Sequence, residues 1–432
     1  MIRYDQALPR FAFAVKEAIG EQELLKHVFL RDAAGRLTFV ASHVLEPAVL
    51  DQICREAENL APWVDQTLPV ASPGDLFDED LTVPGAGNFE YIRQEDFEGF
   101  VRVVERRLVG QDWLRPPMPA IDGAPPIVVF ASHKGGVGRS TALSVASAAL
   151  SRDGQNLLVI DLDLEAPGLA SMLLKDMPAF GALDYFVESG VSDVDDAFLD
   201  DMIGTAALAS DGLLHVVPAV GKSSADHPEN VLGKIARAYV ERMDTDDRTI
   251  SFLDRTRELI QRLCSRTRYD AIFVDARAGL NEATAAAILG LGADILLFGV
   301  DTPQTFAGYR YFLAHLERFR PSASGEDDWR YRLRMVQAKA QADPKAQSDY
   351  RTHTFELFSD TLYDAEEGIE EQAFNFDYDD PNAPHYAWPI LYDGNYAEFD
   401  PIARGDQFAE HMYDRTFGPF IEALRETIGR GT

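Results

Sequence analysis

The feature that most constrains the fold is a glycine-rich run, SHKGGVGRST at residues 132–141, which lies between an apolar stretch and a segment with helical spacing. The apolar stretch, Ile127–Phe130, has the composition of a buried strand, and Leu143, Ala146 and Leu150 recur on one face of the segment that follows. A strand, a glycine-rich loop and a helix in this order form the context of a phosphate-binding loop. The glycines let backbone N–H groups turn towards phosphate oxygens, and the helix directs its positive dipole end at the same oxygens.

Two further apolar runs each end in aspartate. Leu157–Ile160 is followed by Asp161 and Asp163, and Ala271–Val274 is followed by Asp275. Short apolar runs of this kind are typical of strands buried on both faces of a parallel sheet. Carboxylates at the carboxyl ends of such strands lie at the edge where α/β sheets bind ligands. The expected fold is therefore α/β, with a mostly parallel sheet flanked by helices.

The loop and the two aspartate-ended strands together resemble the ParA/MinD family of deviant Walker A P-loop ATPases, whose loops read K-G-G-V-G-K-T-T. Lys134 matches the additional lysine at the front of that loop, whereas Arg139 stands at the position of its P-loop lysine. The resemblance covers about 125–340 and returns at 385–428. It implies a P-loop NTPase fold, ATP and Mg²⁺ as cofactors, and ATP hydrolysis.

The resemblance also implies a role for each site residue. Ser140 would be a Mg²⁺ ligand, and Asp161 and Asp275 would hold the waters of the ion, which takes oxygen ligands. Asp163 would polarise the attacking water, and Lys134 would contact the nucleotide of a facing subunit, so that ATP joins two subunits as a homodimer. The nucleotide-binding residues would be Gly135, Gly136, Val137, Gly138, Arg139, Ser140 and Thr141.

Arg139 leaves two outcomes open for the reaction. Arginine is always charged and binds phosphate bidentately, but it is bulkier than lysine and planar. Lys134 and Asp163, both present, favour a slow ATPase in which Arg139 takes part. The alternative is a nucleotide-binding interaction protein with little or no hydrolysis. We expect the neighbouring Arg277 to pair with an acidic side chain.

Composition bears on the class of partner. The 432 residues include 40 Lys and Arg against 71 Asp and Glu, a formal net charge of −31. Such a charge repels nucleic acid and anionic membranes, so we expect neither as a partner. Two cysteines, Cys54 and Cys264, and no apolar stretch long enough to span a bilayer indicate a cytoplasmic protein. The process that this protein serves does not follow from its sequence.

The chain has three expected parts. Residues 1–114 form a small α+β accessory domain of unknown function, residues 115–126 a proline-rich linker, and residues 127–432 the ATPase-like domain. Residues 343–383 form an acidic, aromatic insertion, either a solvated surface excursion or a docking surface for a basic protein partner. The accessory domain is the other candidate surface for a protein partner.

Several elements are expected from periodicity alone. In the accessory domain, helices are predicted around Phe11–Ile19, Val49–Leu60 and Phe100–Leu108, and strands at 27–31 and 36–42. In the ATPase-like domain, further strands are predicted at Leu213–Val217, Ile295–Val300, Leu333–Val336 and Pro389–Leu391.

Overall fold

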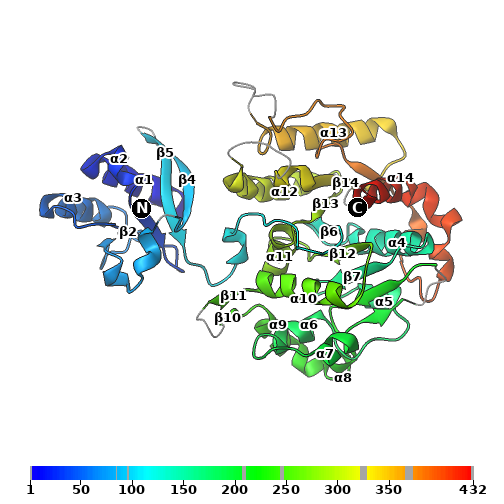
Figure 1. Ribbon diagram of the computed structural model, residues 1–432. Coiled ribbons are helices and arrows are strands. Elements are labelled where there is room, and N and C mark those ends of the chain that lie inside the picture. Colours follow the sequence, from blue (N-terminus) through cyan, green and yellow to red (C-terminus); the bar gives the residue numbers. More distant parts are fainter. Residues whose placement is uncertain are drawn as a thin grey trace. The chain divides into compact units, whose positions relative to one another are not determined.

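The computed structural model describes residues 2–83, 85–94, 97–206, 211–243, 248–321, 328–364 and 373–429. The chain divides into two compact units, Met1–Leu114 and Arg115–Thr432, and each is described by itself (Figure 1). Among the described residues, no helix combines the length and the apolar character needed to cross a membrane.

The first unit is built on a five-stranded mixed sheet of order β3-β2-β1-β5-β4. Its strands are β1 (Val28–Arg31), β2 (Leu37–Val40), β3 (Val70–Ala71), β4 (Asn88–Gln94) and β5 (Phe97–Glu105). Its helices are α1 (Tyr4–Ile19), α2 (Glu21–Leu24) and α3 (Pro47–Glu58), with short 3₁₀ turns η1 (Gly74–Leu76), η2 (Glu79–Thr82) and η3 (Asp112–Leu114). The first unit of the structure thus combines helices with a mixed sheet.

One predicted element of this unit is wrong. The apolar residues of 100–108 were expected on a helix, but most of this segment belongs to strand β5. Val101 and Val103 alternate with Arg102 and are buried in the core formed with Phe11 and Phe29. Phe100 points away from that core and is 55% exposed, as period-2 alternation requires. Branched valines at every second position favour a strand, a signal that the helical spacing of the other apolar residues obscured.

The second unit contains an eight-stranded sheet of order β15-β14-β13-β6-β12-β7-β9-β8. The strands are β6 (Ile127–Ser132), β7 (Leu157–Asp161), β8 (Gly204–Thr205), β9 (Leu214–Val217), β12 (Ala271–Asp275), β13 (Asp294–Gly299), β14 (Leu333–Ala340) and β15 (Trp388–Leu391). All neighbouring pairs are parallel except β8 and β9. A separate antiparallel pair joins β10 (Arg242–Met243) to β11 (Thr249–Ile250). The mostly parallel sheet and its predicted strands are confirmed.

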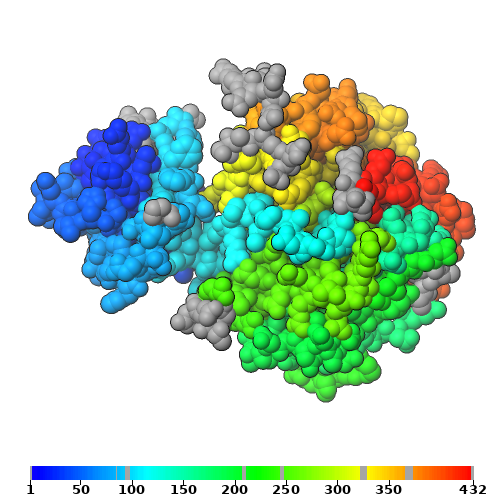
Figure 2. Space-filling model, viewed as in Figure 1, coloured from blue at the N-terminus to red at the C-terminus, as the bar shows by residue number. Residues whose placement is uncertain are grey.

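Helices flank this sheet. They are α4 (Arg139–Arg152), α5 (Leu169–Leu173), α6 (Ala182–Glu188), α7 (Asp196–Asp201), α8 (Lys222–Asp226), α9 (Val231–Ala238), α10 (Phe252–Arg266), α11 (Glu282–Gly290), α12 (Pro303–Leu316), α13 (Pro344–Ser359) and α14 (Glu410–Gly429). Short 3₁₀ turns are η4 (Pro228–Asn230), η5 (Glu317–Phe319), η6 (Trp329–Arg332), η7 (Gly394–Tyr396) and η8 (Gly405–Phe408). In Figure 2 a cyan surface lies between a yellow surface and a green one, while the residues of β6, which has a central place in the sheet, are buried.

The main core lies between one face of the sheet and helices α4 and α14. The rings of Phe130 and Phe298, on central strands, contact Phe420 of α14 there, and Phe273 packs against Phe130. The next residue of β6, Ala131, points to the opposite face of the sheet and lies near residues of α11 and α12. Both faces of the sheet are therefore covered, which explains why its strands read as continuous apolar runs.

The segment expected as an acidic insertion begins with helix α13, which contacts α12 and β14. Its acidic residues 366–371 lie outside the described residues. Asp364 is paired with Arg330 at 2.7 Å, and Phe374 is buried beneath the same guanidinium, 4.4 Å from its centre. Asp379 pairs with Arg351 at 2.7 Å. Asp364 and Phe374 are thus held by internal contacts, whereas the side chain of Asp379 is 80% exposed.

Candidate functional site

The glycine-rich run connects β6 directly to α4, so the predicted strand, loop and helix are confirmed as elements. Gly136 and Gly138 have φ of 74° and 95°, in the left-handed region that side chains disfavour. Gly138 is the N-cap of α4 and its carbonyl accepts the first helical bond, from Ala142 N at 2.9 Å. The free N–H groups of the first turn of α4 therefore end at this loop, the arrangement that binds anions.

The three predicted carboxylates meet at the same edge of the sheet. Asp161 ends β7 and Asp275 ends β12, and the two residues are partners in the parallel ladder. Asp163 follows two residues after Asp161. Their exposed fractions are 0%, 1% and 9% respectively. Since β12 lies between β6 and β7, this buried acidic cluster lies beside the glycine-rich loop.

Arg139 is bonded to this cluster. Its Nε donates to Asp275 Oδ1, its Nη2 donates to Asp163 Oδ2 at 3.1 Å, and its Nη1 donates to Ser132 Oγ at 3.2 Å. The guanidinium is buried, with its side chain 7% exposed. Burial alone would lower the pKa of Arg139, but the two carboxylates raise it above its ordinary value. Arg139 thus compensates the charge of two buried aspartates.

Asp161 has a second task, which is to hold the turn after β7. Its Oδ1 accepts a bond from Asp163 N at 3.0 Å, and its Oδ2 accepts bonds from Gly168 N and Leu169 N, each at 3.2 Å. Burial, and then the charge of Asp275, raise the pKa of Asp161 to about 7. The backbone donors act in the opposite direction and favour the charged form.

The composition of the cluster fits a divalent cation. Ser140 Oγ donates to Asp275 Oδ2 at 2.5 Å, so a hydroxyl and a carboxylate already converge. Burial raises the pKa of Asp275 in spite of the guanidinium beside it. Asp163 Oδ1 is buried without a hydrogen-bond partner among the described residues. Three carboxylates against one guanidinium leave excess negative charge, and hydroxyl and carboxylate oxygens are the ligands that Mg²⁺ takes.

The front of the loop contacts α12. Lys134 is exposed, and its Nζ donates to Gln304 Oε1 at 3.1 Å. The ring of His133 packs directly on Gly308, where an added Cβ would come within 2.0 Å of its Cδ2. Because Gly308 has no side chain, the ring of His133 can pack directly against helix α12.

A cavity of about 420 Å³ opens on the other side of the loop. The residues that line it come from the loop, from α4, from the ends of β14 and β15 and from α14: Gly136, Val137, Gly138, Thr141, Phe298, Ala338, Lys339, Ile390, Leu391, Tyr392, Asp393, Tyr396, Ala397, Thr416 and Phe417. Its volume suits a small organic ligand. Of the predicted nucleotide-binding residues, four line it directly.

Sequence reasoning missed Lys339 as a site residue. Lys339 Nζ donates to the carbonyl of Gly136 in the loop at 2.7 Å. The residue lies near the end of β14, beyond the apolar run from which that strand was predicted, and no motif marks it. Only the sheet order, with β14 two strands from β6, brings it to the loop.

The expectation for Arg277 is confirmed, because its guanidinium pairs with Glu165. Tyr239 donates to the same carboxylate, with Oη 3.0 Å from Oε1. This pair joins the loop after β12 to the loop after β7, next to the acidic cluster.

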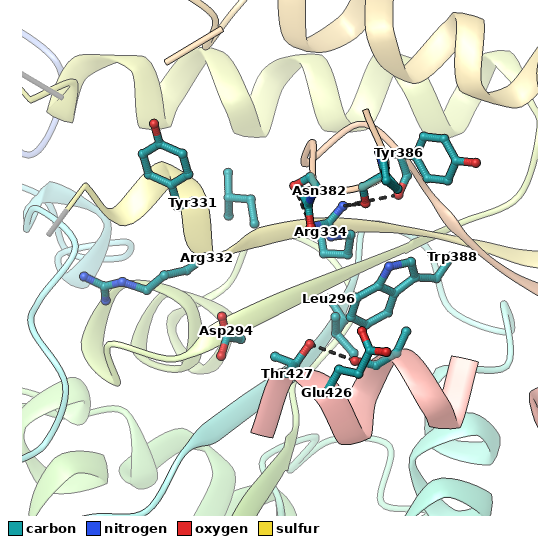
Figure 3. Close-up of a pocket in the computed structure, with 13 residues that line it drawn as sticks. Asp294, Leu296, Tyr331, Arg332, Arg334, Asn382, Tyr386, Trp388, Glu426 and Thr427 are labelled. Atoms are coloured by element: carbon teal, nitrogen blue, oxygen red, sulfur yellow. Dashed lines mark hydrogen bonds between the residues drawn. The ribbon is translucent and has the colours of Figure 1, made fainter. Parts of the chain in front are cut away.

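A second cavity, of about 360 Å³, lies at the amino-terminal ends of β13 and β14, the opposite edge of the sheet from the glycine-rich loop. Figure 3 shows Arg334 near its centre, beside Trp388 and Asn382. The guanidinium of Arg334 donates to the carbonyls of Asn382, at 2.7 Å, and Ala383. Since Arg334 is occupied in holding this backbone, we do not assign the cavity a ligand.

The first unit contains a cluster of Glu23, His27 and His43 whose nitrogen and oxygen atoms lie close enough to suggest a metal. Ser42 N donates to His27 Nδ1 at 3.1 Å, which places the proton of the neutral ring on Nε2. Nε2 lies 3.7 Å from Glu23 Oε1 and has no hydrogen-bond partner among the described residues. Nε2 therefore offers a proton, not a lone pair, to an ion. Burial, and then His43, lower the pKa of His27 to about 4.

Known proteins give a limited comparison. No family model matches the chain, and no curated protein matches its sequence. A ParA family ATPase from Chlorobium tepidum TLS is 17% identical, over 68% of this chain and 99% of its own, with a TM-score of 0.42. An ATP complex of a substituted McdA from Cyanothece is 14% identical, over 71% and 97%, with a TM-score of 0.44. The ParA of pNOB8 bound to nonspecific DNA is 15% identical, over 71% and 100%, with a TM-score of 0.39. At such identities and scores, the function of this chain has to be inferred from its own residues.

Proposed function

We propose that this protein is a Mg-ATP-binding P-loop ATPase that hydrolyses ATP slowly and acts as a nucleotide-dependent dimerisation switch. One observation supports the proposal above the others: the glycine-rich loop ends at the start of α4 beside a buried cluster of Asp161, Asp163 and Asp275. A nucleoside triphosphate requires hydrogen-bond donors for its phosphates and oxygen ligands for its metal ion. An anion-binding loop next to clustered carboxylates supplies both.

In this proposal the loop N–H groups of residues 135–140 bind the phosphates, and the cavity beside Thr141 receives the rest of the nucleotide. Ser140, Asp275 and Asp161 would hold Mg²⁺ directly or through water, and the ion would neutralise phosphate charge. Asp163, with one buried oxygen unpartnered among the described residues, would orient the attacking water. Phosphoryl transfer asks little covalent chemistry of a protein, so positioning and charge dominate.

The position of Arg139 affects the rate of ATP hydrolysis that we expect. Its guanidinium holds Asp163 and Asp275, the residues proposed to orient water and to hold the metal. Water activation and metal binding both compete with these ion pairs, which supports slow turnover. The second candidate, a nucleotide-binding interaction protein with little or no hydrolysis, is favoured by the same contact if Arg139 does not release the carboxylates.

The proposed output is a homodimer formed with ATP, to which Lys134 contributes by contacting nucleotide in the facing subunit. Its exposure at the front of the loop agrees with such a role. A protein partner would then bind through the first unit or through residues 343–383.

A turnover assay tests the proposal. Purified protein should release phosphate from Mg-ATP slowly, and Asp163→Ala should reduce the rate at least tenfold while ATP still binds. Binding without any difference in rate between the two proteins would favour the non-hydrolysing candidate. Failure of the wild type to bind ATP would overturn both. Light scattering with and without Mg-ATP tests the switch, since an unchanged monomer contradicts it.

A further inference from the structure

Strand β14 brings an unusual lysine to the glycine-rich loop. Lys339 has φ of 54°, one of two non-glycine residues with positive φ among the described residues. It lies where the pairing of β14 with β15 shifts register between Gln337 and Ala340. A side chain in the left-handed region is unfavourable, and such outliers concentrate at functional sites. From this irregular position the side chain of Lys339 reaches the loop.

The contact of Lys339 is with the backbone that would bind phosphates. Its ammonium donates to Gly136 O at 2.7 Å, and Gly136 has the positive φ that shapes the loop. Lys339 also lines the cavity of about 420 Å³ beside the loop. Among the described residues that line this cavity, Lys339 is the one that carries a positive charge.

The other cations of the loop have different partners. Arg139 holds Asp163 and Asp275. Lys134 donates to Gln304 on α12. A bound nucleoside triphosphate needs cationic donors as well as backbone N–H groups, because its phosphates carry several negative charges. Lys339 is placed to meet that need from the cavity side of the loop.

We propose that Lys339 is a nucleotide-binding residue, which donates from β14 to the phosphates that the P-loop lysine serves in other loops of this kind. The inference rests on the proposed function, since it assigns a further binding residue to the same site. Lysine suits this position because its compact ammonium on a flexible stem can move from Gly136 O to a phosphate oxygen.

Binding of ATP by calorimetry, in Mg²⁺ and at low salt, tests Lys339 with three variants. Lys339→Gly removes the charge and relieves the positive φ, so its folding should be unharmed. Lys339→Gln keeps a neutral donor for Gly136 O. Both should bind ATP about 10- to 100-fold more weakly than wild type, as expected for loss of a charge-assisted bond. Lys345→Gln, on an 83% exposed lysine of α13, should leave the affinity unchanged.

The salt dependence of ATP affinity distinguishes a contribution from the charge of Lys339 from a purely structural support of the loop. If Lys339 acts by its charge, the gap between wild type and Lys339→Gln should narrow as NaCl is raised. If Lys339→Gln binds as wild type does while Lys339→Gly does not, the lysine only braces the loop and the inference is overturned. Equal affinity of all variants overturns it as well. Neither result affects the proposed function, which these binding measurements would contradict only if the wild type did not bind ATP.

Discussion

The ion pairs of Arg139 make a strong prediction about stability. Replacing Arg139 by Met removes bonds to Asp275, Asp163 and Ser132 and leaves two buried carboxylates without their cation. Removing one partner of a buried ion pair typically costs about 3–5 kcal/mol, since the other charge stays buried. The side chain of Arg139 is 7% exposed, so solvent screening reduces this figure little. We expect the free energy of unfolding in EDTA to fall by that amount.

Urea-induced unfolding of the full chain measures the effect, and a surface pair provides the control. Arg262 pairs with Asp196 at 3.2 Å, but the side chain of Asp196 is 74% exposed. Arg262→Met should therefore cost less than about 1 kcal/mol. The double variant Arg139→Met with Asp275→Asn should be more stable than the sum of its single changes predicts, because it removes both sides of one buried pair.

Mg²⁺ adds a second readout. If the cluster accepts a divalent cation, Mg²⁺ should restore part of the stability of Arg139→Met and stabilise it more than it stabilises the wild type. Arg139→Met within about 1 kcal/mol of wild type in EDTA would refute the charge-compensation reasoning. Strict additivity in the double variant would refute it too, since the residues would not then be coupled.

Three other perturbations have defined outcomes. Gly308→Ala places a Cβ 2.0 Å from His133 Cδ2 and should lower both the ATP affinity and the melting temperature. The control Gly233→Ala should lower neither, because the atom nearest to its added Cβ is 3.5 Å away. Because the folded pKa of His27 is lowered to about 4, protonation favours the unfolded state, and stability present above pH 6.5 is lost as pH falls towards 4. Hydrogen exchange of the first unit should report a loss of about 1.4 kcal/mol by pH 5.5, absent in His27→Gln. Arg330→Met breaks a buried pair with Asp328 at 2.7 Å and should expose residues 360–364 to proteolysis.

The sequence predicted the second unit well because its strands are buried on both faces. Continuous apolar runs such as Leu157–Ile160 and Ala271–Val274 have few alternative structures at that length, and each ends in an aspartate at the ligand-binding edge. The first unit was harder to predict. In β5, alternation between the core and the opposite face competes with apolar residues at helical spacing, and only strand pairing with β1 and β4 decides between them.

The partners of site residues were beyond prediction for a different reason. The resemblance implied that Arg139 binds the nucleotide, but residue type alone does not distinguish phosphate from carboxylate as its partner, because arginine binds both. Its choice of Asp275, 136 positions away in the chain, depends on β12 lying next to β6. The contact of Lys339 with the loop occurs at a local shift in strand register, which no sequence pattern predicts.

Arginine at position 139 has a physical consequence that lysine would not have. Its planar fork spans Asp275, Asp163 and Ser132 at once, whereas one ammonium lacks the reach to hold all three in the same arrangement. A lysine there would be freer to leave the carboxylates for a phosphate. Arginine thus places a fixed cation at the acidic cluster, and under the proposed function a charge that faces the phosphates would have to come from another residue. Lys339, on the cavity side of the same loop, is where the structure offers that charge.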